Sequence, residues 1–299
     1  MSVDGLEAEQ KEEAPGTNGL VPRSDVYVGP PTSEFVSDDE RLHEVFHANT
    51  KVDLVSEMQT GFMFGKVMSN PMLHRTLANP YRANPSLERV EMPFPAAINL
   101  PYSHVIGRRR SVRDFDGGAI GLAQLSVLLH TAYGITGEAM LDGNIPLQLR
   151  SVPSGGGLYP LEIYVIASRV EGLGANEVYH YVVRDHALER LGRAVPIEDL
   201  SATLLGSRPE CVLGSAATIL VSGVFIRMTY KYGDRGYRFV LMESGAVSAQ
   251  LNYAATGLGL GSCQVAGYYD DRVDAYVDVD GVNESVLNCV VVGRPTQPV

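Results

Sequence analysis

The sequence predicts a fold of alternating strands and helices, either α/β or α+β. Two observations lead to this prediction. Short apolar runs rich in Val and Ile, such as 161–167 and 216–225, have the length and character of buried strands. Between and after them lie segments with apolar residues at helical spacing, the longest at 240–256. Because hairpin signals are few, strands and helices are expected to alternate along the chain.

Composition and charge narrow the class of protein. The chain has 299 residues, of which 45% are hydrophobic and 20% charged, enough for one large domain or two small ones. Its net charge of −11 opposes non-specific binding to nucleic acid or to an anionic membrane. No apolar run reaches the roughly 20 residues of a membrane span, and the acidic N-terminus does not resemble a signal peptide. Three widely spaced cysteines predict no disulfide framework and fit a reducing cytoplasm.

The negative charge is concentrated at the start of the chain. Residues 1–40 hold ten acidic and two basic side chains, and we predict an acidic, disordered tail there. Residues 41–100 combine a helical pattern over 41–72 with a proline-rich, extended connection that begins near residue 79. We predict that this region docks the substrate or a partner. Residues 101–299 form the predicted main domain.

The expected elements of the main domain follow in order. A helix over 120–133 has one apolar stripe and Gly134 as its stop. The later expected elements are strands at 161–167 and 178–183, a short helix from Pro196 to Leu205, a strand at 216–225, a helix at 240–256 and a strand at 286–292. The helix at 240–256 is rich in Gly, Ala and Ser, so it is expected to be buried or to form a dimer contact.

The segment Arg108-Arg109-Arg110-Ser111-Val112-Arg113 is the first candidate site. Its four arginines repel one another unless an anion balances them, and guanidinium groups bind phosphate with paired hydrogen bonds. The alternative is a solvated basic turn paired with Asp114 and Asp116.

Two further segments carry unusual composition. Pro153-Ser154-Gly155-Gly156-Gly157 precedes a predicted buried strand, and its glycines permit close approach to a flat ligand or form a merely flexible loop. Lys231-Tyr232 stands in an aromatic segment ahead of the long helix. The pair offers two proton carriers whose pKa values burial and charge can shift, although an aromatic surface loop is the alternative.

The remaining signals predict structural roles. The glycines over 257–261 follow a helix and do not open one, so a helix stop is expected there and not a dinucleotide site. Cys263 lacks an activating neighbour and is expected to be a small buried residue. His43 and His47 lie four residues apart without an evident third ligand, and no metal site is predicted.

Taken together, these segments resemble one family. The order Arg-Arg-Ser-x-Arg-x-Phe, Pro-Ser-Gly-Gly, Leu-Tyr-Pro-Leu-Glu-Ile-Tyr, Lys-Tyr-Gly-x-Arg-Gly-Tyr-Arg and Gly-Leu-Gly is similar to the SagB/ThcOx-type dehydrogenases of the nitroreductase-like flavoproteins. The resemblance runs from about residue 45 to the C-terminus. It implies an α+β fold with a central mixed sheet flanked by helices and a domain-swapped type of homodimer that holds FMN. It also implies oxidation of thiazolines or oxazolines in ribosomally made peptides, beside a cyclodehydratase.

The resemblance also implies roles for individual residues. The residues that match FMN phosphate and ribityl contacts are Arg109, Arg110, Ser111, Arg113 and, at the C-terminal contact, Arg294. Those that match the loop lying against the flavin from the other subunit are Pro153, Ser154, Gly155 and Gly156. Those that match the stretch facing flavin N5 are Ala266 and Gly267. The catalytic pair is matched by Lys231 and Tyr232.

The chemistry of azoline oxidation gives this pair a purpose. Aromatisation removes one hydride and one proton, so a base must take the proton while the flavin takes the hydride. We expect Tyr232 to act as that base, directly or through a relay, with Lys231 lowering its pKa or orienting the substrate. Family members often carry His and a Gln-Asn pair on the following helix, where this chain has Ala246, Ala249 and Gln250. Two alternatives therefore stay open: an NAD(P)H-dependent nitro or quinone reductase, and a non-catalytic component of a peptide-modifying complex.

Overall fold

The computed structural model describes residues 42–52, 65, 79–141, 145–205 and 208–298. The chain divides into two units, Met1–Asn49 and Thr50–Val299. In the first unit the described segment is helix α1 (Leu42–Asn49), none of whose residues is buried. The predicted acidic tail lies outside the described residues. So does most of the helical pattern predicted over 41–72, from residue 53 onward.

The second unit is built on a seven-stranded sheet with the order β1-β6-β5-β4-β8-β11-β9. The strands are β1 (Arg89–Glu91), β4 (Leu161–Ala167), β5 (Glu177–Val182), β6 (Ala187–Ala194), β8 (Ala217–Val224), β9 (Gly261–Val265) and β11 (Glu284–Gly293). Their ladders are antiparallel. Two isolated bridges beside these ladders are parallel: Ser111 pairs with Ser262, and Ile120 pairs with Val170.

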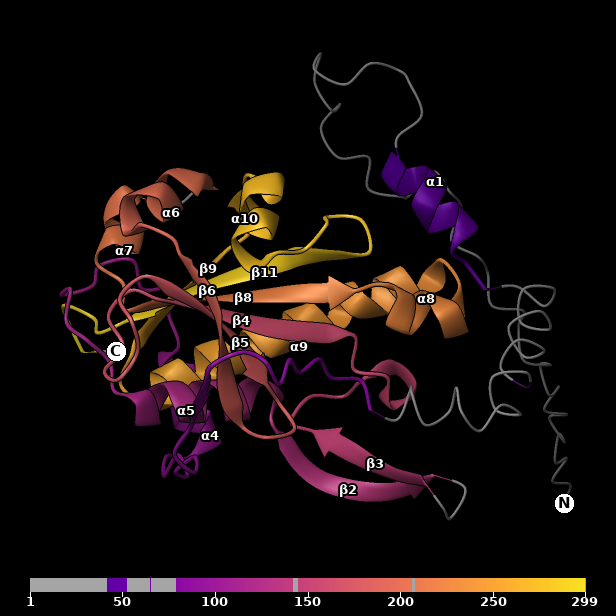
Figure 1. Ribbon diagram of the computed structural model, residues 1–299, viewed down its shortest axis with the longest axis horizontal. Coiled ribbons are helices and arrows are strands. Elements are labelled where there is room, and N and C mark those ends of the chain that lie inside the picture. Colours follow the sequence, from indigo (N-terminus) through magenta and orange to yellow (C-terminus); the bar gives the residue numbers. More distant parts are fainter. Residues whose placement is uncertain (1–41, 53–64, 66–78, 142–144, 206–207, 299) are drawn as a thin grey trace, which may run out of the picture. The chain divides into compact units, whose positions relative to one another are not determined.

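Helices cover both faces of the sheet (Figure 1). One face carries α5 (Leu122–Tyr133) and α9 (Arg235–Gly257), with α4 (Tyr102–Arg108) beside α9. The other carries α6 (Ile197–Thr203), α7 (Pro209–Leu213) and α10 (Asp270–Val277). The sequence of β4 is continuously apolar because its alternate residues pack into two different cores, one on each face of the sheet. Ile163 packs in the core with α5 and α9, and Tyr164 packs in the core with α6 and α10.

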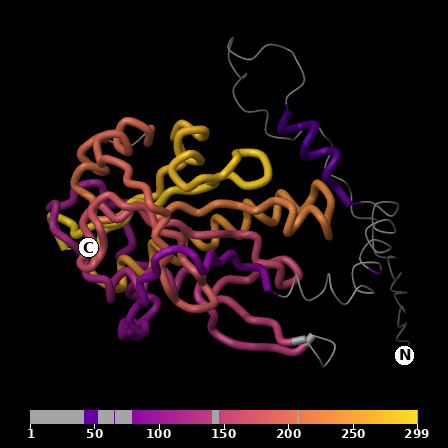
Figure 2. Tube along the Cα trace, viewed as in Figure 1, coloured from indigo at the N-terminus to yellow at the C-terminus, as the bar shows by residue number. Residues whose placement is uncertain are grey.

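Three smaller elements complete the second unit. Strands β2 (Ile135–Leu141) and β3 (Ile145–Arg150) form a separate antiparallel hairpin, seen at the lower edge of the tube in Figure 2. Strands β7 (Leu204–Leu205) and β10 (Gly267–Tyr268) form a second short pair. A 3₁₀ turn, η2 (Gly155–Gly157), connects β3 to β4. The predicted α+β class is confirmed.

The aromatic segment around Lys231 differs from the loop that its composition suggested. It forms α8 (Ile226–Tyr232), a turn at Gly233, and the first turn of α9, which begins five residues before the predicted start. Gly233 has φ +56°, a left-handed conformation that glycine adopts without strain, and this reverses the chain between the two helices.

Candidate functional site

The arginine segment is held between two strands at one end of the sheet. It follows α4, and Val112 donates its backbone N–H to the Ser262 carbonyl of β9 over 2.8 Å. Phe115 then pairs with Pro295, just beyond the end of β11. The segment therefore runs as an extended ribbon whose side chains stand off the sheet edge.

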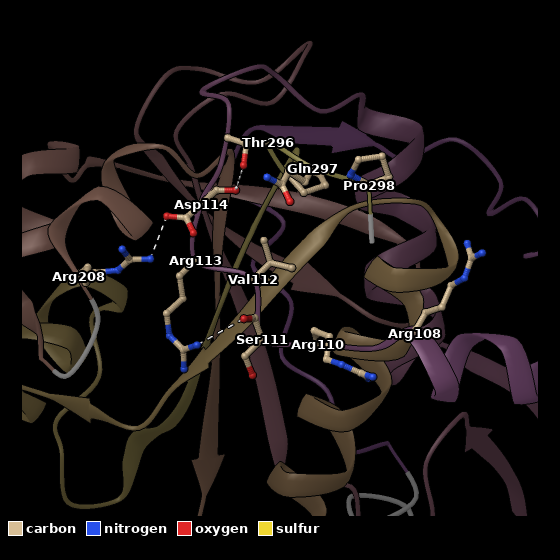
Figure 3. A pocket seen from close by; sticks show the side chains of 11 residues that line it. Arg108, Arg110, Ser111, Val112, Arg113, Asp114, Arg208, Thr296, Gln297 and Pro298 are labelled. Carbon is tan, nitrogen blue, oxygen red and sulfur yellow. Dashed lines mark hydrogen bonds and ion pairs between the residues drawn. The ribbon is translucent and has the colours of Figure 1, made fainter.

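These side chains line a cavity of about 580 Å³. Its lining includes Arg108, Arg110, Ser111, Arg113 and Arg208, and the C-terminal segment 295–298 closes another wall. Figure 3 shows Arg113 and Arg110 on either side of Ser111, with Arg208 beside Asp114. Arg208 stands at the N-cap of α7, and its distance along the chain explains why the sequence did not reveal it.

The cavity carries an excess of positive charge. Asp114, the one acidic residue among the described residues of its lining, pairs with Arg208 at 2.9 Å. Among the described residues, no ion pair joins Arg108, Arg110 or Arg113 to a carboxylate. Instead, Arg110 donates to the carbonyl of its neighbour Arg109 over 2.8 Å. Such a set of guanidinium groups with a serine hydroxyl is the chemistry that binds a phosphate group.

Two of the expected phosphate ligands lie outside this cavity lining. Arg109 is the C-cap of α4 and donates its backbone N–H to Val105. Arg294 pairs with Asp116 at 3.1 Å, and its guanidinium lies against Gly118. The residues after Arg294, and not its own side chain, line the cavity.

The glycine-rich loop is fixed by contacts on both sides. Tyr159 donates its backbone N–H to Ser154 Oγ over 2.9 Å. Its phenol accepts the backbone N–H of Arg150 over 3.0 Å, and its φ of +43° is unusual for a residue with a side chain. Gly156 has φ +65°. A backbone constrained in this way presents the loop in one conformation.

Lys231 and Tyr232 lie directly against this loop. A Cβ atom placed on Gly156 would come within 2.5 Å of Lys231 Nζ and 2.6 Å of the Tyr232 hydroxyl. Lys231 Nζ also stands 5.1 Å from the centre of the Tyr232 ring. Gly156 therefore provides the space that both functional groups occupy, and the structure brings together two of the predicted segments.

Burial shifts the pKa values of this pair in opposite directions. Desolvation lowers the pKa of Lys231 and raises that of Tyr232. For Tyr232 this direction is opposite to the lowering expected from Lys231, and the other expected role of Lys231, orienting the substrate, stays a prediction. An amine with a lowered pKa is a better proton acceptor near neutral pH than a phenol with a raised one.

A buried carboxyl group that sequence reasoning missed stands behind the loop. Glu243 of α9 is 4% exposed and accepts a 2.7 Å hydrogen bond from the Tyr133 hydroxyl. Desolvation raises its pKa to about 7, against the lowering effects of Ser154, Tyr133 and Arg150. A charged residue inside a helix of small residues gives no periodic signal, so only the packing identifies it.

The two groups of residues stand at opposite ends of β8. The arginine segment lies past Val292, which pairs with Ala217 at the start of β8. The glycine loop leads into Leu161, which pairs with Gly223 at the other end, and α8 begins shortly after. Eight residues of strand span about 25 Å. Figure 1 shows α4 and α8 correspondingly far apart, so one chain does not unite the predicted phosphate ligands with the predicted catalytic pair.

The remaining predicted residues occupy the following positions. Ala266 and Gly267 are exposed at the end of β9, and Gly267 pairs with Leu205. Ala246, Ala249 and Gln250 are partly buried on α9. The three cysteines are free and buried. Within the described ranges, no group of His, Cys, Asp or Glu side chains could hold a metal ion, and no helix there is long and apolar enough to cross a membrane.

Comparison with known proteins gives consistent matches. The profile of the Nitroreductase family matches residues 106–294. The chain is 31% identical over 212 residues to MJ1384 of Methanocaldococcus jannaschii, a protein assigned by name to the nitroreductases, covering 69% of this chain and 98% of that protein. It is 28% identical over 193 residues to the microcin B17-processing protein McbC of Escherichia coli, covering 62% and 68% of the two chains.

A solved structure agrees on the fold. A chain in the E. coli microcin synthetase McbBCD complex with truncated pro-MccB17 bound matches with a TM-score of 0.54 and 23% identity. The match covers 87% of this chain and 99% of that chain. At this identity it supports the arrangement of strands and helices alone.

Proposed function

The chain belongs to the nitroreductase family, and we propose that it is an FMN-dependent dehydrogenase that oxidises thiazoline or oxazoline rings in a ribosomally made peptide to thiazoles or oxazoles. One observation carries the proposal: Lys231 Nζ and the Tyr232 hydroxyl converge on the backbone of Gly156. A proton acceptor beside a glycine backbone is what removal of a proton from a flat ring over a flavin requires.

The arginine cavity fits the phosphate of FMN. Three of its arginines have no carboxylate partner among the described residues, and Ser111 adds a hydroxyl donor. Arg108, Arg110 and Arg113 would hold the phosphate together with Ser111. The opposite pole of the cofactor site would be the glycine loop. Its open side is at Gly157, where no atom lies within 4 Å of an added Cβ, whereas Lys231 and Tyr232 fill the space beside Gly156.

A homodimer would bring these two poles together. Helix α9 exposes an apolar stripe, with Leu241 43% exposed, Met242 70% exposed and Gly245 open to solvent. Gly245 is four residues from Leu241 and three from Met242, so each of these two side chains neighbours Gly245 on the helix surface. Apolar residues on an exposed face indicate an interface. Packing two copies through α9 would bring the arginine cavity of one chain to the glycine loop of the other.

Lys231 and Tyr232 on α8 would have different roles in the reaction. FMN, when bound, supplies the hydride acceptor. The neutral amine of Lys231, which burial favours, would take the proton from the ring carbon. Tyr232, whose raised pKa keeps its phenol protonated, would donate a hydrogen bond to the ring heteroatom and orient the azoline.

A peptide substrate and partner proteins belong to the same proposal. McbC is named for processing microcin B17, and the matched structure is a complex that contains the truncated pro-peptide. We infer that this chain acts on a peptide whose azolines a cyclodehydratase has formed. The predicted docking region, residues 41–100, would contact that peptide or that partner.

One experiment tests the proposal directly. The purified protein is incubated with an azoline-bearing peptide and FMN, and mass spectrometry records the loss of two hydrogens per ring. Lys231→Ala and Tyr232→Phe should abolish turnover while FMN remains bound. Full activity in both variants would contradict the assignment.

A second candidate function is reduction of nitro or quinone compounds by NAD(P)H. The observation that favours it is the 31% identity with MJ1384 over nearly the whole of that protein. Oxidation of NAD(P)H with a nitroarene, and no oxidation of azoline peptides, would support this candidate. A protein that binds no FMN and oxidises neither substrate would instead be a non-catalytic component of a complex.

A further inference from the structure

We propose that Arg227 is a positioning residue for Lys231 and Tyr232, because it ties α8 to the strand and the loop against which that pair works. The inference deepens the proposed function and rests on it. Arg227 touches neither the predicted cofactor ligands nor the space beside Gly156; it acts through the placement of its helix.

Arg227 makes two contacts outside its own helix. Its Nη2 forms an ion pair with Glu162 Oε1 on β4. Its Nη1 donates to the backbone carbonyl of Tyr159 over 3.5 Å, two residues after Gly157. The guanidinium thus joins the first turn of α8 to the sheet and to the end of the glycine loop. The planar guanidinium directs these two donors from separate nitrogens in a fixed fork, whereas an ammonium presents all its donors from one nitrogen on a flexible stem.

The anchor for Arg227 is itself fixed. Glu162 is 1% exposed, and its Oε2 lies 2.8 Å from His180 Nε2 on the neighbouring strand β5. Burial alone would raise the pKa of Glu162, but Arg227 and His180 outweigh it and lower that pKa to about 2. The carboxylate is therefore charged at neutral pH and has a partner at each oxygen, so it cannot follow a displaced helix.

Helix α8 needs such an anchor because it is short. Seven residues do not form a stable helix on their own, so contacts with the rest of the protein set its position. Met228 is its one fully buried residue in the structure. Arg227 and Lys231 are four residues apart and share one face, and the same spacing relates Met228 to Tyr232. Displacement of the first turn would therefore move both functional groups away from Gly156.

The experiment compares Arg227→Lys and Glu162→Gln with a matched control. Arg193→Lys alters another arginine that contacts one carboxylate and one backbone carbonyl, and its partners, Asp278 and Ala275, belong to α10 and its C-cap. Each FMN-loaded protein is acetylated over a range of pH, and mass spectrometry gives the midpoint at which Lys231 reacts. Steady-state oxidation of the azoline peptide gives kcat and KM.

We expect Arg227→Lys to move the Lys231 midpoint upward, toward that of an ordinary lysine, by about half a pH unit or more. We expect kcat to fall at least about tenfold with KM within about twofold, because the pair is misplaced while peptide binding is kept. Glu162→Gln should act in the same direction, and Arg193→Lys should match the wild type in both measurements.

Two results separate the possible failures. If Arg227→Lys and Glu162→Gln bind FMN and leave the Lys231 midpoint where Arg193→Lys leaves it, Arg227 does not position the pair. If the wild type oxidises no azoline while the midpoint still moves in the two variants, the positioning role stands and the proposed function fails. If Arg227→Lys does not fold, Glu162→Gln, which removes the ion pair and leaves the Arg227 side chain unchanged, decides the question.

Discussion

The hydroxyl of Tyr133 donates a 2.7 Å hydrogen bond to the carboxyl group of Glu243, linking α5 to α9 beneath the glycine loop. Tyr133 also accepts the backbone N–H of Leu161 over 3.2 Å, at the start of β4. The guanidinium of Arg150 lies over the Tyr133 ring at 4.2 Å. One polar cluster therefore connects two helices, the central sheet and the segment that leads into the loop.

This cluster predicts a pH-dependent stability. Glu243 has a pKa raised to about 7 in the folded protein, against 4.5 in its unperturbed state. Its contribution to stability is fully present below about pH 4.5 and is lost as the pH rises through about 7, because the unfolded chain ionises freely and the buried group does not. Across that window the free energy of unfolding should fall by about 3 kcal/mol from this group.

The measurement is urea unfolding at pH 5 and pH 8. Glu243→Gln, whose amide resembles the protonated carboxyl group, should lose this part of the pH dependence. Glu198→Gln on α6, an exposed position, serves as the control and should follow the wild type. Equal pH dependence in the wild type and Glu243→Gln would show that Glu243 does not titrate in this range.

Gly156 provides a prediction about the catalytic pair. In Gly156→Ala, the new methyl group meets Lys231 Nζ and the Tyr232 hydroxyl at about their present positions. Azoline oxidation should fall about tenfold or more, because both groups must move. The left-handed backbone adds a destabilisation of about 1–2 kcal/mol.

Gly157→Ala separates these two effects. Its φ of +68° carries the same backbone strain, but no atom lies within 4 Å of the added methyl group. The two variants should therefore lose similar thermal stability, while only Gly156→Ala should lose most of its activity. Equal losses of activity would mean that strain in the loop, and not displacement of the pair, is responsible.

How far the sequence predicts the structure depends on which element is considered. Strand β4 is predicted to the residue, because both of its faces are buried and its whole run is apolar. Helix α5 is predicted within two residues, since Gly134 ends its apolar stripe. Strand β6 is missed because its second half alternates between partly buried and exposed positions and holds a glycine and an arginine in place of a continuous apolar run. In this chain the sequence pattern therefore predicts an element best where at least one face of that element is completely buried.

The candidate site is predictable in its parts and not in its arrangement. The resemblance names Arg110, Arg113 and Lys231, but nothing in the spacing places the arginines and the lysine at opposite ends of β8. Glu243 and Arg227 are hidden because neither belongs to a recognisable motif, and only the packing shows that Glu243 is buried and that Arg227 reaches Glu162. Such contacts depend on tertiary structure and leave no local signature.

The arginine cavity predicts which residues control FMN affinity. Arg110 and Arg113 line the cavity, whereas Arg109 does not. A hydrogen bond to a charged group contributes about 1.5–3 kcal/mol, so Arg110→Gln and Arg113→Gln should each weaken FMN binding about tenfold to a hundredfold. Arg109→Gln should have a much smaller effect. Titration of the apoprotein with FMN, followed by quenching of flavin fluorescence, measures all three.

Salt provides the second part of this test. Because the interaction is between opposite charges, added salt should weaken FMN binding to the wild type more than to Arg110→Gln. If Arg109→Gln loses as much FMN affinity as Arg110→Gln, the cavity is not the phosphate site. That result would support the ligands implied by resemblance alone.

The exposed stripe on α9 predicts a dimer that a single charge disrupts. Met242 is 70% exposed in one chain, and in the proposed homodimer its side chain would be covered by the partner. Met242→Lys would bury an unpaired ammonium group there, which is strongly unfavourable. Val282→Lys places the same charge at a site that is 77% exposed between α10 and β11, away from the stripe. Sedimentation velocity should show monomers for Met242→Lys and dimers for Val282→Lys and the wild type.

Because the glycine loop and the arginine cavity of one chain lie at opposite ends of β8, FMN content should fall together with dimerisation. A monomeric Met242→Lys that retains its full FMN content would show that one chain holds the cofactor by itself.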